Sequence, residues 1–326
     1  MRVLVCGGAG YIGSNMTAML VKEGHEPIVY DNLRTGYEQA VRDAELIKGD
    51  LADRELLVRT LKSRRIEAVM HFAASIEAGE SVRNPLEYYG NNVCNTRTLL
   101  LAMEQTGVEK LVFSSTAAVY GTPASVPITE DAPKCAINPY GETKWAVERM
   151  CHFQVQAERL RYVALRYFNA AGAGEGGTLG EDHKPETHLI PLAIQAALGQ
   201  RPSVSIYGTD YPTEDGTCVR DYIHIEDLCS AHLLALAKLE KEAEQAYNLG
   251  NGRGYTVRQV INTVRKVTGR EFRVVASPRR IGDPAVLTAC SDKAARELGW
   301  KVKYPQLDSI IESAWKWHSS HPRGYR

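Results

Sequence analysis

Tyr140 and Lys144 are the two side chains in this 326-residue sequence whose spacing most directly suggests acid–base chemistry. They lie four residues apart in a helical pattern, so both side chains are expected on one face of a helix. A phenol with a pKa of about 10 is a poor base at neutral pH, and lowering that pKa to about 7 requires about 4 kcal/mol. One positive charge about 4 Å away supplies about that amount at an effective dielectric constant near 20. The pair therefore predicts a tyrosine base tuned by a lysine, although such a pair alone is more often a surface helix pair.

A hydroxyl side chain is expected near this pair. Thr116 follows the apolar segment Leu111–Ser115, and ligands of open parallel sheets bind beyond the carboxyl ends of the strands. A hydroxyl there can bridge a substrate hydroxyl and the tyrosine. The alternative is a residue that only caps the strand end. Ser114 and Ser115 are further candidates, and spacing does not choose among the three.

The glycine-rich segment Gly7–Gly13 connects an apolar strand to a helical pattern. Gly7, Gly10 and Gly13 permit a tight turn, close approach of a pyrophosphate and close packing of the helix, whose N-terminus attracts phosphate. Asp31 follows eighteen residues after Gly13, at the end of the next strand-like run. A carboxylate there accepts ribose hydroxyls and repels a 2′-phosphate, so NAD is favoured over NADP. The alternative for Asp31 is a turn aspartate.

The elements that must position these residues alternate along the first half of the chain. Strand-like runs alternate with helical patterns, which predicts right-handed βαβ units and a doubly wound parallel sheet of the Rossmann type. The expected strands are Val3–Gly7, Pro27–Asp31, Ala68–Ala74, Lys110–Ser115 and Tyr162–Phe168. The expected helices are Ser14–Glu23, Arg54–Arg64, Leu86–Gln105 and Asn138–Arg161.

The domain organisation predicted from this pattern is a dinucleotide-binding domain over residues 1–170 and a smaller α/β substrate domain over residues 171–326. A Gly-rich loop is expected after Asn169. Its length is typical of a functional lid or a disordered segment. The segment at about 222–250 is expected to return to the first domain.

Composition narrows the function classes. Lysine plus arginine and aspartate plus glutamate both number 39, so no global field favours nucleic acid or an anionic membrane. The predicted partner is a small molecule. Seven scattered cysteines without a CxxC pair argue against a disulfide framework or a zinc site and for a reducing compartment. Because no targeting segment or membrane span is evident, the expected location is the cytoplasm.

Taken together, these residues resemble the extended short-chain dehydrogenase/reductase family, and within it the UDP-glucose 4-epimerases. The resemblance spans almost the whole chain, and its C-terminal motifs matter most because many dehydrogenases share the first half. The N-terminal motifs are Gly7–Gly13, Gly79–Asn92, Ser114–Gly121, Asn138–Lys144 and Leu165–Gly172. The C-terminal motifs are Tyr207–Leu228, Tyr247–Gly252 and Arg279–Ala285.

The resemblance implies reversible inversion at C4 of UDP-glucose and UDP-galactose, through a 4-keto intermediate, with tightly bound NAD. Tyr140 would be the base, Lys144 would tune it and hold the nicotinamide ribose, and Thr116 would hydrogen-bond the sugar. The cofactor site would also include Gly7, Gly10, Tyr11, Ile12, Gly13, Asp31, Asn32, Asp50, Leu51, Phe72, Ala73, Ala74, Asn91, Ser114 and Tyr167. The substrate site would also include Asn169, His188, Leu189, Tyr207, Arg220, Arg280, Asp283 and Leu287. The arginines suit bidentate contact with a diphosphate, although each alone is more often a salt-bridge partner.

The sequence departs from the family at two positions. Ile76 stands where many members have a lysine near the cofactor phosphates, which puts that contact in doubt. His188 stands where several members have asparagine. A contact with a phosphate or the uridine ribose and a purely structural histidine are both consistent with this position. Leu287 is expected to narrow the sugar pocket, favouring UDP-hexoses over N-acetylated ones, while UDP-N-acetylglucosamine or UDP-pentose epimerisation remain alternatives.

The nearest rival reaction is nucleotide-sugar 4,6-dehydration. It needs an acid/base beside the catalytic threonine, where this chain has Ala117 and Ala118. A simple dehydrogenase would accumulate free NADH. A non-enzymatic NAD-binding protein would have no need for Tyr140, Lys144 and Thr116 together. The helices Leu86–Gln105 and Asn138–Arg161 resemble the pair that forms a dimer interface in relatives, although their apolar excess also suits sheet-facing core.

Overall fold

The computed structural model describes residues 1–280 and 283–326, so Ile281 and Gly282 of the Arg279–Ala285 motif lie outside the described part. Seven parallel strands form the central sheet in the order β10–β6–β5–β4–β1–β2–β3. The strand order reverses between β1 and β4, and ligands of such sheets bind in the crevice at that point. The doubly wound parallel sheet is confirmed. The strands are β1 (Arg2–Cys6), β2 (Glu26–Asp31), β3 (Glu45–Lys48), β4 (Ala68–His71), β5 (Lys110–Thr116), β6 (Arg161–Tyr167) and β10 (Glu244–Leu249).

The strands of this sheet form where apolar residues run without interruption. Strands covered by helices on both faces need such runs, as β1 and β4 have. The sequence predicted five of the seven strands. It missed β3 and β10, whose sequences ELIK and EQAYNL mix charged or polar residues with apolar ones. The expected strand Ala68–Ala74 was too long, since β4 ends at His71.

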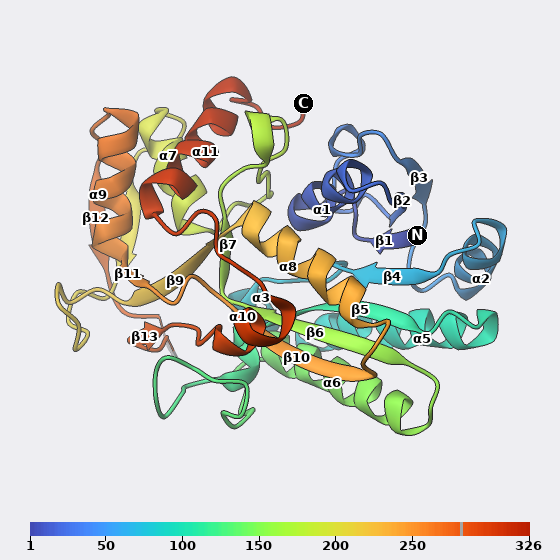
Figure 1. The fold of residues 1–326 in the computed structure, drawn as a ribbon. Coiled ribbons are helices and arrows are strands. Elements are labelled where there is room, and N and C mark those ends of the chain that lie inside the picture. The colour runs from blue at the N-terminus through green and yellow to red at the C-terminus, as the bar shows by residue number, and fades with distance from the viewer. Residues whose placement is uncertain (281–282) are drawn as a thin grey trace.

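Helices cover both faces of the sheet, as Figure 1 shows. One face carries α1 (Tyr11–Lys22) and α8 (Ile225–Lys238), which share a buried apolar cluster with β1, β5 and β6. The opposite face carries α2 (Arg54–Ser63), α5 (Asn95–Thr106) and α6 (Pro139–Gln156), which pack on the sheet through a second cluster. The alternating sequence pattern thus predicted α1 and the helices of the second layer, whereas α8 was not among the expected helices.

Two predicted helices differ from the structure. The expected helix Leu86–Gln105 is divided into α4 (Pro85–Tyr88), a π-helical segment η2 (Tyr89–Cys94) and α5. Wider helical turns of this kind are frequent at functional sites, and η2 contains Asn91. The expected helix Asn138–Arg161 was too long. It ends at Gln156, because Glu158 has a left-handed backbone (φ 58°) and Arg161 already begins β6.

The C-terminal part builds two small sheets beside the large one. The first contains β7 (Asn169–Ala171), β9 (Val219–His224), β11 (Gly254–Thr256) and β13 (Val286–Leu287). The second pairs β8 (Val204–Tyr207) with β12 (Val274–Ser277). A third apolar cluster joins α7 (Leu189–Ala197), α9 (Val257–Thr268) and α11 (Leu307–Ser320) to these strands. The remaining elements are α3 (Ala78–Arg83), α10 (Asp292–Leu298), η1 (Glu38–Ala40), η3 (Ala117–Tyr120) and η4 (Glu175–Gly177).

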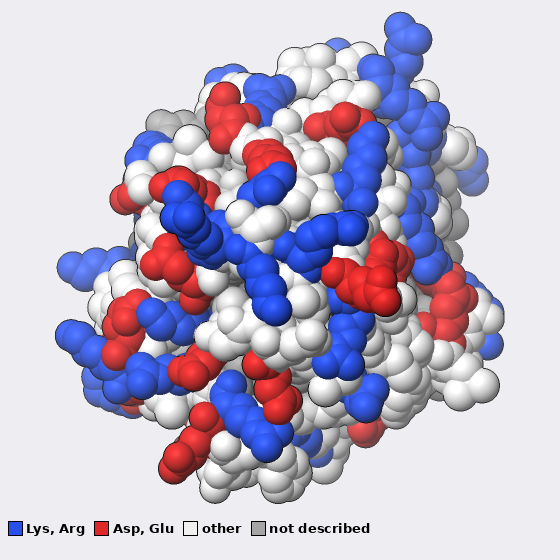
Figure 2. Space-filling view, turned by 90° about the vertical axis from the view of Figure 1, so that its right-hand side faces the viewer, with Lys and Arg blue, Asp and Glu red and all other residues white. Residues whose placement is uncertain are grey.

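Charges of both signs lie next to each other over much of the face drawn in Figure 2, as the equal numbers of acidic and basic residues suggest. Across residues 1–280 and 283–326, no helix combines the length and apolar character that crossing a membrane requires.

Candidate active site

The glycine turn after β1 has the geometry of a phosphate-binding loop. Gly7 has a left-handed backbone (φ 78°), and a Cβ there would lie 2.5 Å from the Ala73 nitrogen. At Gly13 a Cβ would lie 2.1 Å from the Gly7 carbonyl oxygen, so only glycine lets α1 pack this closely on the turn. Helix α1 starts after Gly10 without a side-chain cap or an acidic residue in its first turn. Its first N–H groups are therefore available to an anion.

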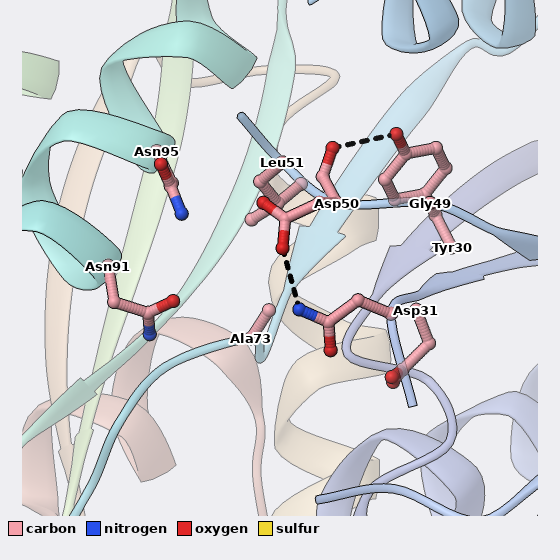
Figure 3. A pocket seen from close by; sticks show the side chains of 9 residues that line it. Tyr30, Asp31, Gly49, Asp50, Leu51, Ala73, Asn91 and Asn95 are labelled. Carbon is pink, nitrogen blue, oxygen red and sulfur yellow. Dashed lines mark hydrogen bonds between the residues drawn. The ribbon is translucent and has the colours of Figure 1, made fainter. Parts of the chain in front are cut away.

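A pocket lies at the carboxyl ends of β2 and β3, beside η2 and α5 (Figure 3). Burial raises the pKa of Asp31, whose two oxygens accept hydrogen bonds from Ala9 N (3.0 Å) and Leu33 N (2.8 Å). The Asn32 amide donates to Asp50 Oδ2 at 2.7 Å. Six of the residues expected at the cofactor line this pocket, namely Asp31, Asn32, Asp50, Leu51, Ala73 and Asn91. Sequence reasoning missed Tyr30, Gly49 and Asn95, which also line it.

The turn and this pocket fit a dinucleotide, because an uncapped helix N-terminus lies beside a buried carboxylate that can accept ribose hydroxyls. Some expected cofactor residues turn their side chains elsewhere. The Tyr11 hydroxyl donates to the Gly172 carbonyl (2.8 Å), and the Phe72 ring packs against His232, with 4.9 Å between the ring centroids. Ile12 is packed against the core cluster beside α8. A cofactor contact from Tyr11 or Ile12 would therefore come from the backbone at the start of α1.

The start of α6 presents Tyr140 and Lys144. Asn138 caps the helix by accepting from Gly141 N at 2.9 Å, and Pro139 occupies the first turn, where its missing N–H has no cost. Lys144 is buried, with 3% exposed, and its Nζ donates to the Ser114 carbonyl at 2.8 Å. The Lys144 ammonium also lies 4.9 Å from the centre of the Phe113 ring. The cap and the proline thus fix the start of α6. Lys144, in its second turn, then reaches the end of β5.

The electrostatics of the pair differ from the simple expectation. Burial raises the pKa of Tyr140, a hydrogen bond with Thr116 opposes that rise, and Glu77 adds to it. Burial also lowers the pKa of Lys144 to about 7, against the opposing effect of Glu148. The expectation that Lys144 and an oxidised nicotinamide together lower the pKa of Tyr140 is not tested by the protein without a ligand. It counted the attraction between the groups and left out the cost of removing each from water.

The three candidate hydroxyls at the end of β5 have different partners. Ser115 is fully buried and donates to Glu148 Oε1 at 2.6 Å. The Ser114 hydroxyl is hydrogen-bonded to the Tyr167 hydroxyl. Thr116 accepts from Ala118 N at 3.2 Å and is the hydroxyl that hydrogen-bonds Tyr140. The structure therefore brings Thr116 together with the tyrosine, while Ser115 is engaged in the core.

A buried ion pair contacts Ser115 at the end of β5, and sequence reasoning missed this ion pair. Glu148 and Arg166 are both almost fully buried, and they form two hydrogen bonds of 2.5 and 3.0 Å. Glu148 also accepts from Ser115 and raises the pKa of Lys144 against the larger effect of burial. Its position four residues after Lys144 was a signal that could have found it, since both lie on one helix face.

The residues expected at the substrate lie on or beside the two small sheets. Arg220 of β9 pairs with Asp283 (Nη2 to Oδ1, 2.9 Å) and donates to the Pro284 carbonyl at 2.9 Å. The Arg280 guanidinium lies over the Tyr207 ring at 4.1 Å from its centre. Four of the expected substrate residues thus contact one another in two pairs within the chain. A bound diphosphate would have to displace these contacts or add to them.

Three further expected substrate residues lie on or beside the sheet of β7, β9, β11 and β13. Leu287 of β13 is in register with Arg220 and packs against the apolar cluster that contains Val119 of η3. The Asn169 amide donates to the Asp221 carbonyl at 2.8 Å. Leu189 begins α7 and packs against the third apolar cluster. Leu287 therefore connects the small sheet to the segment that follows Thr116.

His188 has a different environment from the other expected substrate residues. Its Nδ1 lies 2.8 Å from Glu181 and 3.0 Å from Glu186. Burial lowers the pKa of His188, but the two carboxylates outweigh it and raise that pKa well above its ordinary value. Nδ1 is thus engaged within the protein, and a contact with substrate through Nε2 stays a prediction.

Comparison with known proteins agrees with this fold. The profile of the NAD dependent epimerase/dehydratase family matches residues 3–250, and the chain belongs to that family. A UDP-glucose 4-epimerase of Halalkalibacterium halodurans is 52% identical over 326 residues, which cover 100% of this chain and 98% of the relative.

Two solved structures extend the comparison. A crystal structure of a UDP-glucose 4-epimerase has a TM-score of 0.98 and 50% identity, with 100% of both chains covered. The UDP-glucose 4-epimerase of Brucella ovis in complex with NAD has a TM-score of 0.94 and 48% identity, covering 96% of this chain and 97% of that one.

Proposed function

We propose that this chain is an NAD-dependent 4-epimerase that interconverts UDP-glucose and UDP-galactose. What carries the proposal is the hydrogen bond between Tyr140 and Thr116 and the hydrogen bond from Lys144 to the Ser114 carbonyl, in a chain with a glycine turn after β1. Identity of about 50% over the whole chain to UDP-glucose 4-epimerases supports the choice of substrate.

The proposed mechanism assigns one role to each of the three side chains. Bound NAD would supply the hydride acceptor and donor for C4. Tyr140 takes the proton of the C4 hydroxyl, and Thr116 orients that hydroxyl through its own hydrogen bond. After the sugar turns about its bond to the diphosphate, C4 would receive the hydride on its other face, and the same phenol returns the proton to the C4 oxygen. Lys144 donates to the Ser114 carbonyl, which fixes its ammonium group at the end of β5.

The raised pKa of Tyr140 sets a condition on this mechanism. In the protein alone the phenol stays protonated at neutral pH, because burial opposes its charged form. A base is needed only when substrate is bound. The positive charge of the bound oxidised cofactor, which the protein alone lacks, would favour the phenolate.

The substrate contacts are part of the same proposal. Residues 1–170, with the segment around 222–250, would bind NAD, and residues 171–326 would bind the UDP-sugar. Arg220, Arg280 and Asp283 would grip the UDP moiety while the sugar turns, because anchoring far from the reacting carbon permits rotation. His188, Leu189, Tyr207 and Asn169 would complete the anchor, and Leu287 would limit the sugar pocket.

Residues beside Thr116 argue against the rival 4,6-dehydration. Thr116 is followed by η3, where Ala117 and Ala118 carry no titratable group. The hydroxyl of Tyr120, at the end of η3, donates to Asn248 (2.7 Å) and accepts from Arg166 (2.9 Å). Burial raises the pKa of Tyr120 to about 12, so it is not a ready acid or base for eliminating water.

The proposal also includes a homodimer in the cytoplasm. Leu86, Tyr89 and Phe153 are exposed large apolar side chains along α4, η2 and α6. A second copy of the chain would cover them through the helices expected at the interface. The seven cysteines are all free in the structure, which supports a reducing compartment.

The test follows conversion of UDP-galactose to UDP-glucose without added reductant. Tyr140→Phe should lower turnover by about 10²- to 10⁴-fold, the usual contribution of an acid–base group, while bound NAD is unchanged. Phe153→Tyr, on the exposed side of α6, is the control and should keep full turnover. Full activity in Tyr140→Phe would end the assignment, and NADH accumulating in the wild type would indicate a dehydrogenase instead.

A further inference from the structure

Four side chains between η4 and α7 converge on one point. They are Glu181, His183, Glu186 and His188, and one ligand atom from each lies within 4.8 Å of all the others. Both histidines use Nδ1, and both carboxylates offer an oxygen to both rings. Two imidazole nitrogens and two carboxylate oxygens are donors that suit a divalent transition metal.

The four nitrogen–oxygen separations range from 2.8 to 3.8 Å, on either side of those around a tetrahedral ion. Bonds of about 2.0–2.2 Å place tetrahedral ligand atoms about 3.3–3.6 Å apart. His183 Nδ1 lies 3.1 Å from Glu181 and 3.8 Å from Glu186, and His188 Nδ1 lies 2.8 and 3.0 Å from the same two residues. Adjustments of about half an ångström in side chains would therefore complete the geometry.

Burial and charge also favour a cation at this point. The side chains of Glu181 and Glu186 are each only 4% exposed, and two buried carboxylates need positive charge nearby, which His183 and His188 supply in the protein alone and a divalent ion would supply when bound. One divalent ion would neutralise both carboxylates, with the two imidazoles as neutral ligands. The His188 side chain is 39% exposed, which leaves a path by which an ion can enter.

We propose that Glu181, His183, Glu186 and His188 bind one Zn²⁺ ion, which fastens this segment to the dinucleotide-binding part of the molecule. Neighbouring contacts support the second half of the proposal. The Thr187 hydroxyl donates to Glu77 Oε1 at 2.7 Å, on the segment between β4 and α3. The His183 ring lies edge-on to Tyr11 at the start of α1, with 6.4 Å between ring centroids. An ion here would hold the start of α7 against the glycine turn.

Cysteine spacing carries no information about such a site, because all four ligands are histidine or glutamate. The four residues lie within eight positions of one another, as E-x-H-x-x-E-x-H. Their convergence depends on the fold of the segment, which the spacing does not give. The proposal concerns metal binding and does not depend on the epimerase reaction.

The experiment uses the full-length, NAD-loaded protein, stripped with a chelator and then dialysed against Zn²⁺. Elemental analysis should find one Zn²⁺ per chain, and Zn²⁺ should raise the thermal midpoint. Co²⁺ in place of Zn²⁺ should give the intense visible absorption of a four-coordinate ion. His183→Gln and Glu186→Gln should each weaken Zn²⁺ binding by about 100-fold or more, since changes outside the ligands already cost 10- to 100-fold.

The matched control is His152→Gln. His152 Nδ1 pairs with the carboxylate of Glu244 alone, at 3.0 Å to each oxygen, and its removal should leave Zn²⁺ binding unchanged. Circular dichroism and bound NAD check that each variant is folded. Where a variant does not fold, the Co²⁺ spectrum of the wild type decides, and a six-coordinate spectrum overturns the proposal. Equal Zn²⁺ binding by wild type and folded ligand variants, or equal binding of Mg²⁺, also overturns it.

Discussion

The two halves of the candidate site are built in different ways. Around the glycine turn, the binding groups are backbone N–H groups at the start of α1 and a carboxylate, Asp31, held by two backbone donors. Around the small sheet, the expected binding groups are long side chains that already contact one another, as Arg220 does with Asp283. The first half is therefore shaped before ligand arrives, whereas the second must exchange or extend its own contacts when substrate binds.

This difference is consistent with the two tasks in the proposed reaction. A cofactor that stays bound through the cycle benefits from a site that needs no rearrangement. A substrate that enters, turns and leaves needs a grip that can be released. The predictions below test whether the two halves respond to substitution as this contrast requires.

The largest effect is expected in the preformed half, for Gly13→Ala. The new Cβ would lie 2.1 Å from the Gly7 carbonyl oxygen, and both groups belong to the backbone, so the start of α1 must move. We expect a loss of about 3 kcal/mol in the free energy of unfolding. NAD affinity should fall by about 100-fold, which corresponds to a similar free energy.

Gly79→Ala is the control for this change, because a Cβ at Gly79 meets nothing within 4 Å. Its stability should stay within about 1 kcal/mol of the wild type, and its NAD affinity should be unchanged. Urea unfolding and titration with NAD measure both quantities. Wild-type NAD affinity in Gly13→Ala would show that the turn is adaptable and would remove the contrast between the halves.

The next effect is expected in the adaptable half, for Arg220→Met. Loss of a charge-assisted contact to a diphosphate costs about 1.5–3 kcal/mol, so KM for UDP-galactose should rise about 10- to 100-fold. Bound NAD should not change. Arg279→Met removes an exposed arginine paired with Asp210 and serves as the control, with little expected change in KM. A loss of NAD in Arg220→Met would contradict the separation of the two halves.

Sequence-based prediction worked better for local features than for contacts between residues distant in sequence. The glycine turn, Asp31 and the pair Tyr140–Lys144 could be proposed from the sequence because their geometry is local, fixed by a turn or by one helical repeat. The sheet was predicted where strands are continuous apolar runs. Strands β3 and β10 were missed because their pattern is mixed, and β10 joins the sheet only by pairing with β6, about eighty positions earlier.

Partners that are distant in sequence could not be predicted. Arg220 meets Asp283 across 63 positions, and Ser115 meets Glu148 across 33. Choosing Thr116 over Ser114 and Ser115 required knowing which hydroxyls the core already uses. The raised pKa of Tyr140 in the protein alone could not be predicted for a related reason, since spacing gives an attraction but not the burial that opposes it.

A third effect concerns Lys144, which lies between the two halves. Burial lowers its pKa to about 7, so between pH 7 and its ordinary value of 10.5 the unfolded chain binds a proton that the folded chain does not. Stability therefore rises with pH through this window. In the NAD-free protein, Lys144→Met should be more stable than the wild type by about 2 kcal/mol below pH 7, because removing a buried charge outweighs the lost hydrogen bond to Ser114.

That advantage should shrink and then reverse as the pH approaches 10.5, because the lysine becomes neutral in both states while the wild type keeps its hydrogen bond to the Ser114 carbonyl. Urea unfolding of both proteins from pH 6 to pH 10 measures the difference. Lys48→Met, which removes an exposed lysine paired with Glu38, is the control and should give no comparable gain. A stability difference independent of pH would mean that the buried ammonium carries no such cost.

The smallest effect is expected for Leu287→Ser, in the adaptable half. Leu287 packs beside η3, the segment that follows Thr116, so shortening it enlarges the space near the sugar. We expect kcat/KM for UDP-N-acetylglucosamine to rise about tenfold relative to UDP-glucose, because pocket changes of this size are worth about 1–3 kcal/mol. Val286→Thr is the control, since neighbouring residues of a strand point to opposite faces. If Leu287→Ser leaves the ratio unchanged, Leu287 does not limit the sugar, and specificity must come from the side chains that grip UDP.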